Sequence, residues 1–152
     1  MTTPKKRLEM EIREALKSGQ KQRLATLRLL LTAVTNERIA QGEEVDEAGF
    51  LRLVQKAIKQ RRDSAEQYRN GGREELATNE EAEAEILNRY LPEQVDEDEL
   101  RRAILEFVEH ENLAGASAIG QVMKEMMTRF SGRAEGSSIN MIAREILAQR
   151  TE

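Results

Sequence analysis

The sequence contains no cysteine and no tryptophan, and aromatic residues make up only 3% of its 152 positions. The missing cysteines exclude disulfide bonds, thiolate metal ligands and cysteine nucleophiles. With so few aromatic rings, the core has to be built from Leu, Ile, Val, Met and Ala. There are two prolines and nine glycines, so breaks in regular structure should be few.

No apolar run approaches the roughly 20 residues that span a bilayer. The N-terminal segment to Arg7 is basic, but it leads into a charged amphipathic stretch and not into the apolar centre of a secretion signal. We therefore expect a cytoplasmic protein and no membrane partner.

Charged residues make up 34% of the chain, and its commonest residue types favour helices. The apolar spacing predicts an all-α fold with about four helices followed by three more. Asp46 and Asp96 are expected N-caps, as are Ser117 and either Ser137 or Ser138. The expected helices cover residues 4–18, 21–40, 47–70, 74–91, 96–112, 118–130 and 139–149.

The segment Pro92-Glu93-Gln94-Val95 is the expected domain boundary, because Pro92 disfavours helix at the residue before it. This predicts an N-terminal helical bundle over residues 1–92 and a small three-helix domain over residues 96–150.

The charge is distributed unevenly along the chain. Residues 1–72 carry a net +5, residues 73–111 a net −10 and residues 112–152 a net +1. A basic front half could face a polyanion. Alternatively, the two charge blocks pair only with each other or with solvent.

Catalytic constellations are hard to find. His110 is the only histidine and lies between two glutamates, which favours a solvated residue over a general base. Glu81 and Glu85 could share a cation, but without histidine nearby they are better read as a solvated acidic face. Met123, Met126 and Met127 favour core packing over a binding patch. We expect no catalytic residues, no cofactor and no metal.

A cluster of cations lies in the third expected helix, at Lys56, Lys59, Arg61 and Arg62. Lys56, Lys59 and Arg62 fall within about 100° of helical arc, so they could follow a phosphate backbone. The neighbouring hairpin could add Lys17, Lys21, Arg23 and Arg28. The alternative is pairing one helical turn apart, as between Lys59 and Asp63 or Arg62 and Glu66.

The loop Gly132-Arg133-Ala134-Glu135-Gly136 precedes the last expected helix. Its glycines allow close backbone approach, and the helix start with Arg133 could hold phosphate. The alternative is an ordinary connection between helices.

Several ordered motifs resemble the YqeY family, whose members are similar to the C-terminal tail of the B subunit of glutamyl/aspartyl-tRNA amidotransferases. The first is Lys59-Gln60-Arg61-Arg62-Asp63-Ser64; Gly71-Gly72-Arg73, Glu80-Glu81-Ala82-Glu83 and Tyr90-Leu91-Pro92-Glu93-Gln94 follow it. In the C-terminal part, Gly120, Gly132, Arg133 and Gly136 match the family pattern.

The resemblance implies a non-catalytic accessory module that binds tRNA or a tRNA-charging or tRNA-amidating enzyme. The kinship reaches carbon–nitrogen ligases that use glutamine as amido donor, but no residues of such a ligase are recognisable. Ser137 and Ser138 stand where a Gly-Lys pair is usual, so Lys124 and Arg133 would have to supply the cations of this part.

Two alternatives stay open. One is a protein-interaction module that docks on an amidotransferase or an aminoacyl-tRNA synthetase through the acidic fourth helix and the methionines, without touching RNA. The other is an enzyme built on the Glu81 and Glu85 carboxylates.

Overall fold

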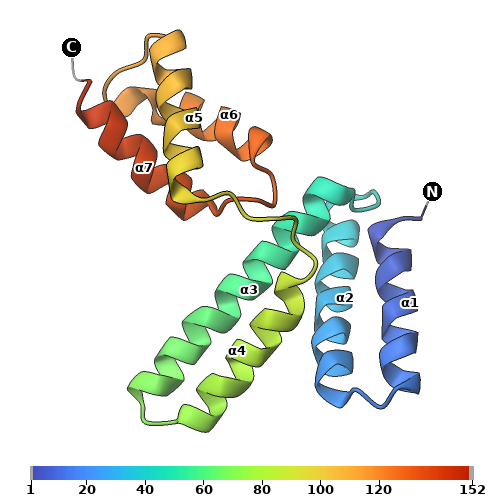
Figure 1. Ribbon diagram of the computed structural model, residues 1–152. Coiled ribbons are helices and arrows are strands. Elements are labelled where there is room, and N and C mark those ends of the chain that lie inside the picture. Colours follow the sequence, from blue (N-terminus) through green and yellow to red (C-terminus); the bar gives the residue numbers. More distant parts are fainter. Residues whose placement is uncertain (1, 151–152) are drawn as a thin grey trace. The chain divides into compact units, whose positions relative to one another are not determined.

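The computed structural model describes residues 2–150, and these are entirely helical and irregular, without a β-strand. The all-α prediction is confirmed. The chain divides into two compact units, residues 1–91 and 92–152 (Figure 1). Each unit encloses an apolar cluster of its own.

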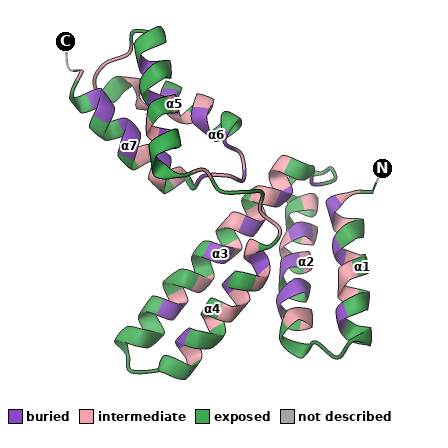
Figure 2. Cartoon of the chain, in the orientation of Figure 1, coloured by how far each residue is buried: buried purple, intermediate pink, exposed green. Residues whose placement is uncertain are grey.

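The first unit holds four helices: α1 (Pro4–Lys17), α2 (Lys21–Gln41), α3 (Glu47–Asn70) and α4 (Glu74–Asn88). In this unit α1 packs against α2, and α2 contacts both members of the long α3–α4 hairpin. The core is formed mainly by aliphatic residues, and Figure 2 shows buried positions along α1, α2, α3 and α4. Its buried members are Leu8, Leu27, Leu30, Val34, Val45, Phe50, Val54, Ile58, Ala84 and Leu87.

The second unit holds α5 (Glu97–His110), a short 3₁₀ turn η1 (Ala116–Ala118), α6 (Ile119–Arg129) and α7 (Gly136–Ala148). In this unit α7 packs against both α5 and α6. Its buried core comprises Leu100, Ile104, Val108, Val122, Met126, Phe130, Ala134, Ile139, Ile142, Ala143, Ile146 and Leu147.

Local signals set several helix ends. Asp46 accepts a hydrogen bond from Gly49 N at 2.8 Å, and Asp96 accepts one from Glu99 N at 2.7 Å, so both expected aspartate caps are confirmed. Gly42 ends α2 with φ +78°, a backbone conformation that suits glycine.

The expected serine caps are wrong. The 3₁₀ turn contains Ser117, and α6 begins after Ala118. At α7 the N-cap position belongs to Glu135, and both Ser137 and Ser138 lie inside the helix. In each case the backbone enters the helical turn earlier than the apolar pattern suggests.

Two large side chains that follow the helical spacing of the apolar residues face solvent instead of the core. The side chains of Leu16 and Tyr68 are 58% and 37% exposed, because they lie towards the ends of α1 and α3.

Candidate nucleic-acid interface

The four predicted cations of the third helix all lie on α3, but two of them are paired with carboxylates. Lys59 Nζ is 3.1 Å from Asp63 Oδ2. Arg61 Nε is 3.6 Å from Glu83 Oε2 on α4, and the Arg61 side chain is only 14% exposed. Arg62 and Lys56 are exposed, and Lys56 forms no ion pair with any described residue. Lys59 and Arg61 are therefore neutralised by neighbouring carboxylates, whereas Lys56 is not.

Arg69 lies further along α3 and joins both sides of the hairpin. Its guanidinium donates hydrogen bonds to Glu74 at 2.9 Å and to Glu81 at 2.7 Å. These hydrogen bonds raise the pKa of Arg69, and the Arg69 guanidinium lowers the pKa of the Glu74 carboxyl. The contacts close the free end of the hairpin, where Gly72 turns with φ +75°.

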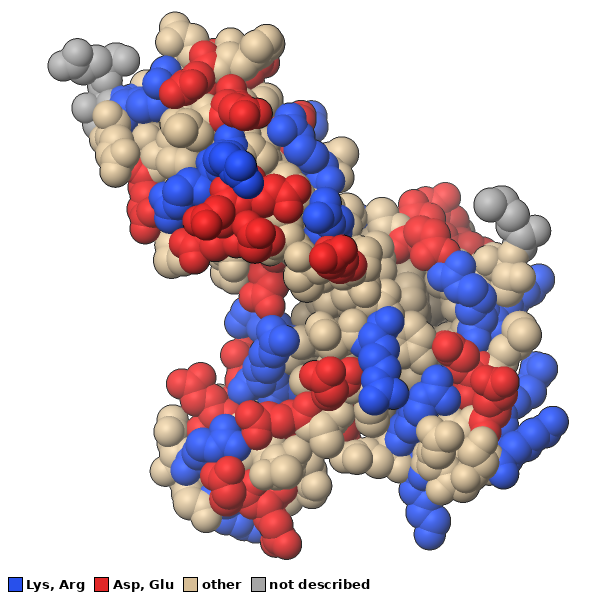
Figure 3. All heavy atoms as spheres, in the orientation of Figure 1, with Lys and Arg blue, Asp and Glu red and all other residues tan. Residues whose placement is uncertain are grey.

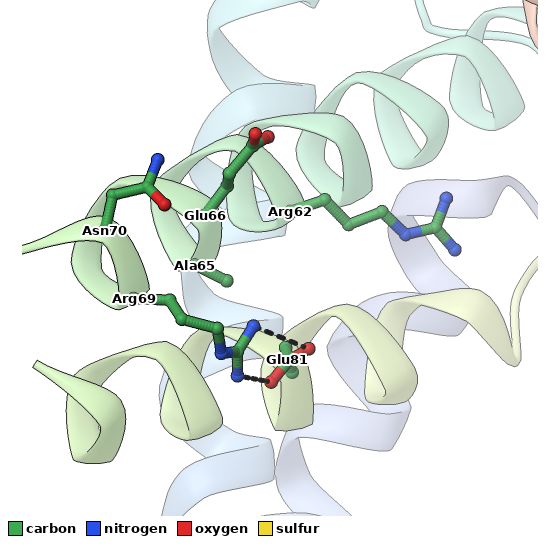
Figure 4. Close-up of a pocket in the computed structure, with 6 residues that line it drawn as sticks. All are labelled: Arg62, Ala65, Glu66, Arg69, Asn70 and Glu81. Carbon is green, nitrogen blue, oxygen red and sulfur yellow. Dashed lines mark hydrogen bonds and ion pairs between the residues drawn. The ribbon is translucent and has the colours of Figure 1, made fainter. Parts of the chain in front are cut away.

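A pocket of about 160 Å³ lies beside Arg69. Figure 4 shows its lining: Arg62, Ala65, Glu66, Arg69, Asn70 and Glu81. Because Glu81 already binds Arg69, the acidic side of α4 takes part in holding the hairpin closed. The motif cations Lys59 and Arg61 and the motif carboxylates Glu81 and Glu83 thus have structural partners within the first unit.

In the second unit, the glycine loop is attached to the segment that enters the unit. Gly132 is buried with φ +75°, and its carbonyl accepts a hydrogen bond from Gln94 Nε2 at 2.8 Å. Arg133 Nε donates to the carbonyl of Glu93 at 3.0 Å, and Val95 N donates to the carbonyl of Arg133 at 2.9 Å. Gly132 and Arg133 therefore position the polypeptide entering the unit.

The start of α7 is a poor anion site. Glu135 occupies its N-cap position, and this acidic residue adds negative charge near the end of the helix that would otherwise attract a phosphate. A Cβ at Gly136 would contact the sulfur of Met127 at 3.5 Å, an ordinary packing distance.

Of the RNA-binding residues predicted in the second unit, Gly120 and Lys124 are the two that are exposed to solvent. Both are exposed on α6, one helical turn apart, and a Cβ at Gly120 would meet nothing within 4 Å. Lys124 forms no ion pair with a described residue. The methionines of α6 differ: Met126 is fully buried, and Met127 is 37% exposed.

Cations free of carboxylate partners gather on α1 and α2. Lys6, Arg13 and Lys17 are exposed on α1, and Lys21 and Arg28 are exposed on α2. None of the five forms an ion pair among residues 2–150, whereas Arg23 lies 3.8 Å from Glu11. Figure 3 shows Lys and Arg side chains gathered over α1 and the α1–α2 end of the first unit.

Sequence reasoning gave Lys17, Lys21 and Arg28 only a supporting role and missed Lys6 and Arg13. The usable signal for Lys17, Lys21 and Arg28 is an absence, because residues 15–36 contain no Asp or Glu. Lys6 and Arg13 lie outside this window, among Glu9, Glu11 and Glu14, so the sequence does not single them out. No carboxylate within this window can neutralise its four cations, in contrast to α3, which carries Asp63 and Glu66 beside its cations.

Groups suited to acid–base chemistry are scattered in the described part of the chain. The His110 side chain is 85% exposed and has only Glu111 beside it, at 3.2 Å. Burial first, and the nearby Glu11 second, raise the pKa of Tyr90 further from neutrality. Among residues 2–150, no three His, Asp or Glu side chains lie close enough together to hold a metal ion. Within the same residues, no helix is both long and apolar enough to cross a membrane.

Comparison with known families gives a match over almost the whole chain. The model of the family described as Yqey-like protein matches residues 5–147.

Three fungal relatives carry the name altered inheritance of mitochondria protein 41, mitochondrial. The protein of Pyrenophora tritici-repentis is 30% identical over 136 residues, which cover 86% of this chain and 73% of the relative. The protein of Lachancea thermotolerans is 36% identical over 85 residues, covering 55% of this chain and 46% of the relative. That of Saccharomyces cerevisiae strain YJM789 is 27% identical with the same two coverages. The chain thus spans about half the length of the latter two.

These names contradict the expected cytoplasmic location, since all three relatives are named as mitochondrial proteins. The expectation rested on the missing apolar run and on an N-terminal segment that does not resemble a secretion signal. Those features bear on membrane insertion and secretion, and they do not distinguish one aqueous compartment inside the cell from another.

Proposed function

The chain belongs to the Yqey-like protein family. On this basis we propose that it is a non-catalytic accessory protein that binds tRNA by contacting the phosphate backbone of the RNA. The resemblance of this family to the tail of the amidotransferase B subunit is the reason for proposing tRNA as the ligand. The protein contributes recognition, and bond-making chemistry belongs to a partner enzyme.

The observation that carries the proposal is the set of unpaired cations on α1 and α2. Lys17, Lys21 and Arg28 lie in a window without any acidic residue. Lys and Arg side chains in such a window attract phosphates over a distance of about a Debye length, roughly 8 Å at physiological salt.

The net charge of −4 does not remove this attraction. The excess of carboxylates lies in residues 73–111, whereas residues 1–72 have a net charge of +5. The separation leaves a local positive field and predicts moderate affinity, since a polyanion that strays from the basic surface is repelled.

Salt dependence provides the test. Fluorescence anisotropy with labelled, unfractionated tRNA is measured at several salt concentrations. Five phosphate contacts predict a loss of affinity of about 10²- to 10³-fold between roughly 50 and 200 mM salt. Affinity that does not change with salt, or no binding at micromolar protein, contradicts the proposal.

A second candidate is docking on an amidotransferase or an aminoacyl-tRNA synthetase without RNA contact. The observation in its favour is the exposure of Met127 and Met141, at 37% and 56%, because flexible methionines suit protein surfaces. Glu81 and Glu83, from the acidic helix, are already engaged by Arg69 and Arg61. Capture of such an enzyme after nuclease treatment, with no tRNA binding by the purified protein, favours this candidate.

A further inference from the structure

The side chains of Lys6, Arg13 and Lys17 form one row on α1. Their spacing of seven and four residues places them within about 40° of arc on the helix. All three are exposed, and Leu8 and Ala15 on the opposite side of α1 are 1% and 0% exposed. The row therefore points directly away from the core and extends about 16 Å along the helix axis.

On α2, Lys21 and Arg28 repeat the arrangement with a spacing of seven residues. Both are exposed, whereas Leu27, Leu30 and Val34 of the same helix are buried. Lys17 is the last residue of α1 and Lys21 the first of α2, so the short turn between the two helices brings them to the same end of the hairpin. The hairpin thus presents cations from two adjacent helices and around the turn that joins them.

The hairpin has no aromatic side chain. The first aromatic residue of the chain is Phe50, which is buried at 4% exposure. Proteins that bind single-stranded nucleic acid stack bases on aromatic rings, and this surface has none. Only contacts to phosphates and to the general shape of the ligand are available to it.

A double helix presents more charge to such a row than a single strand does. In double-stranded DNA the two strands together carry one phosphate per about 1.7 Å of helix axis, and one strand carries half that density. Along the 16 Å of the α1 row, a duplex of comparable charge density carries about nine phosphates around its circumference. A lipid surface fits less well, because interfacial helices bury a broad apolar face, whereas the large exposed apolar side chains of the hairpin are scattered over both helices, at Met10, Leu16, Leu29 and Ile39.

Building on the proposed function, we infer that the α1–α2 hairpin binds the phosphate backbone of double-helical RNA through Lys6, Arg13, Lys17, Lys21 and Arg28. The stems of a folded RNA are the segments that this surface contacts. Lys59 and Arg61 on α3 and the Gly132 loop make contacts within their own units.

The test compares two double variants of the full-length protein. Arg13→Glu with Lys17→Glu reverses two charges of the row. The control, Arg52→Glu with Arg102→Glu, reverses two exposed cations on α3 and α5 that have no ion pair with a described residue. Both variants change the net charge equally and use a residue that favours helix. Circular dichroism and thermal melting check folding, and Gln replacements at the same positions serve if a Glu variant unfolds.

Three labelled ligands are used: tRNA, an RNA hairpin with a stem of about 16 base pairs, and an unstructured RNA strand of equal length. We expect the hairpin RNA to bind more tightly than the unstructured strand. Charge reversal in the row should weaken hairpin and tRNA binding by about tenfold or more, and the control should weaken it by less than about threefold.

The outcomes separate the inference from the proposed function. If tRNA binds but both double variants lose affinity equally, or the unstructured strand binds as well as the hairpin, the inference is overturned and the proposed function stands. If no RNA binds, both are overturned. Binding to anionic phosphatidylserine vesicles that depends on Arg13 and Lys17, without RNA binding, identifies a membrane surface and also overturns the inference.

Discussion

The guanidinium of Arg69 on α3 binds the carboxylate of Glu81 on α4 through Nη2–Oε1 at 2.7 Å and Nη1–Oε2 at 3.5 Å (Figure 4). The same guanidinium donates two hydrogen bonds of 2.9 Å to Glu74. One cation therefore joins the end of α3, the start of α4 and the middle of α4. The small buried residues Ala65 and Ala77 are the apolar contribution here, so the end of the hairpin depends more on this network than the base does.

Replacing Arg69 with Ala should loosen the end of the α3–α4 hairpin and leave the rest of the first unit intact. The pairs are exposed, so the expected fall in melting temperature is small. Amide hydrogen exchange should become faster in residues 66–80 and stay unchanged in α1 and α2. Lys56→Ala is the matched control, because Lys56 is an exposed α3 cation with no ion pair among the described residues. Equal exchange in both variants would show that the network does not hold the hairpin end.

The pKa values of the Glu74 and Glu83 carboxyls should be shifted in opposite directions from the ordinary glutamate value. The Arg69 guanidinium lowers the pKa of Glu74, whereas burial, followed by the neighbouring Glu80, raises the pKa of Glu83. A lowered carboxyl pKa contributes stability that is present above the unfolded value and is lost as pH falls through the folded value. The hairpin end should therefore loosen in acid, and protonation of Glu83 should oppose this loss.

Carbon-detected NMR titration measures both groups. Glu74 should titrate below the ordinary glutamate value and Glu83 above it. In Arg69→Ala, the pKa of Glu74 should return towards the ordinary value while that of Glu83 stays raised. A Glu74 titration that Arg69→Ala leaves unchanged would contradict the assigned cause.

Local chemistry explains which parts of the fold were predictable. Asp46 and Asp96 cap helices through atoms three residues away, so the sequence contains the whole signal. The pairing of Arg61 with Glu83 joins residues 22 positions apart in sequence and depends on how α3 and α4 pack. The sequence offered Lys59–Asp63 pairing as an alternative, and that pair forms. The sequence alone could not show that Arg61 is buried against α4.

The candidate site was less predictable than the fold, because an exposed cation is defined by the absence of partners. Arg133 and Lys17 look equally available in the sequence. In the structure, Arg133 donates to the Glu93 carbonyl and lies 5.8 Å from the centre of the Phe130 ring. Lys17 has no such contact with a described residue.

The two units should unfold independently, because their buried clusters share no residue. Leu27 in the first unit and Ile142 in the second are 0% and 1% exposed. Truncating either to Ala should cost about 2–5 kcal/mol. Leu27→Ala should lower the melting temperature of the first unit alone, and Ile142→Ala that of the second. Amide exchange resolved by residue provides the measurement. Destabilisation that spreads equally through both units in either variant would mean that they fold as one cooperative body.

Gly132 and Gly120 differ in whether the fold requires a glycine at their position. Gly132 is buried at φ +75°, where an L side chain is strained by roughly 1–2 kcal/mol. Gly120 lies in the first turn of α6, with open space around its Cβ direction. Gly132→Ala should therefore destabilise the second unit by about 1–2 kcal/mol, measured by denaturant unfolding. Gly120→Ala should leave stability unchanged or raise it by up to about 1 kcal/mol.

The tRNA affinities of the same two variants then show whether the second unit contributes to binding. If binding resides in the α1–α2 hairpin, both folded variants should bind tRNA like the unchanged protein. Gly120→Ala adds one methyl group to an exposed helical face beside Lys124 and disturbs no packing. Weaker tRNA binding by Gly120→Ala with full stability would therefore place a close RNA contact on α6, and the phosphate-binding surface would then include the second unit.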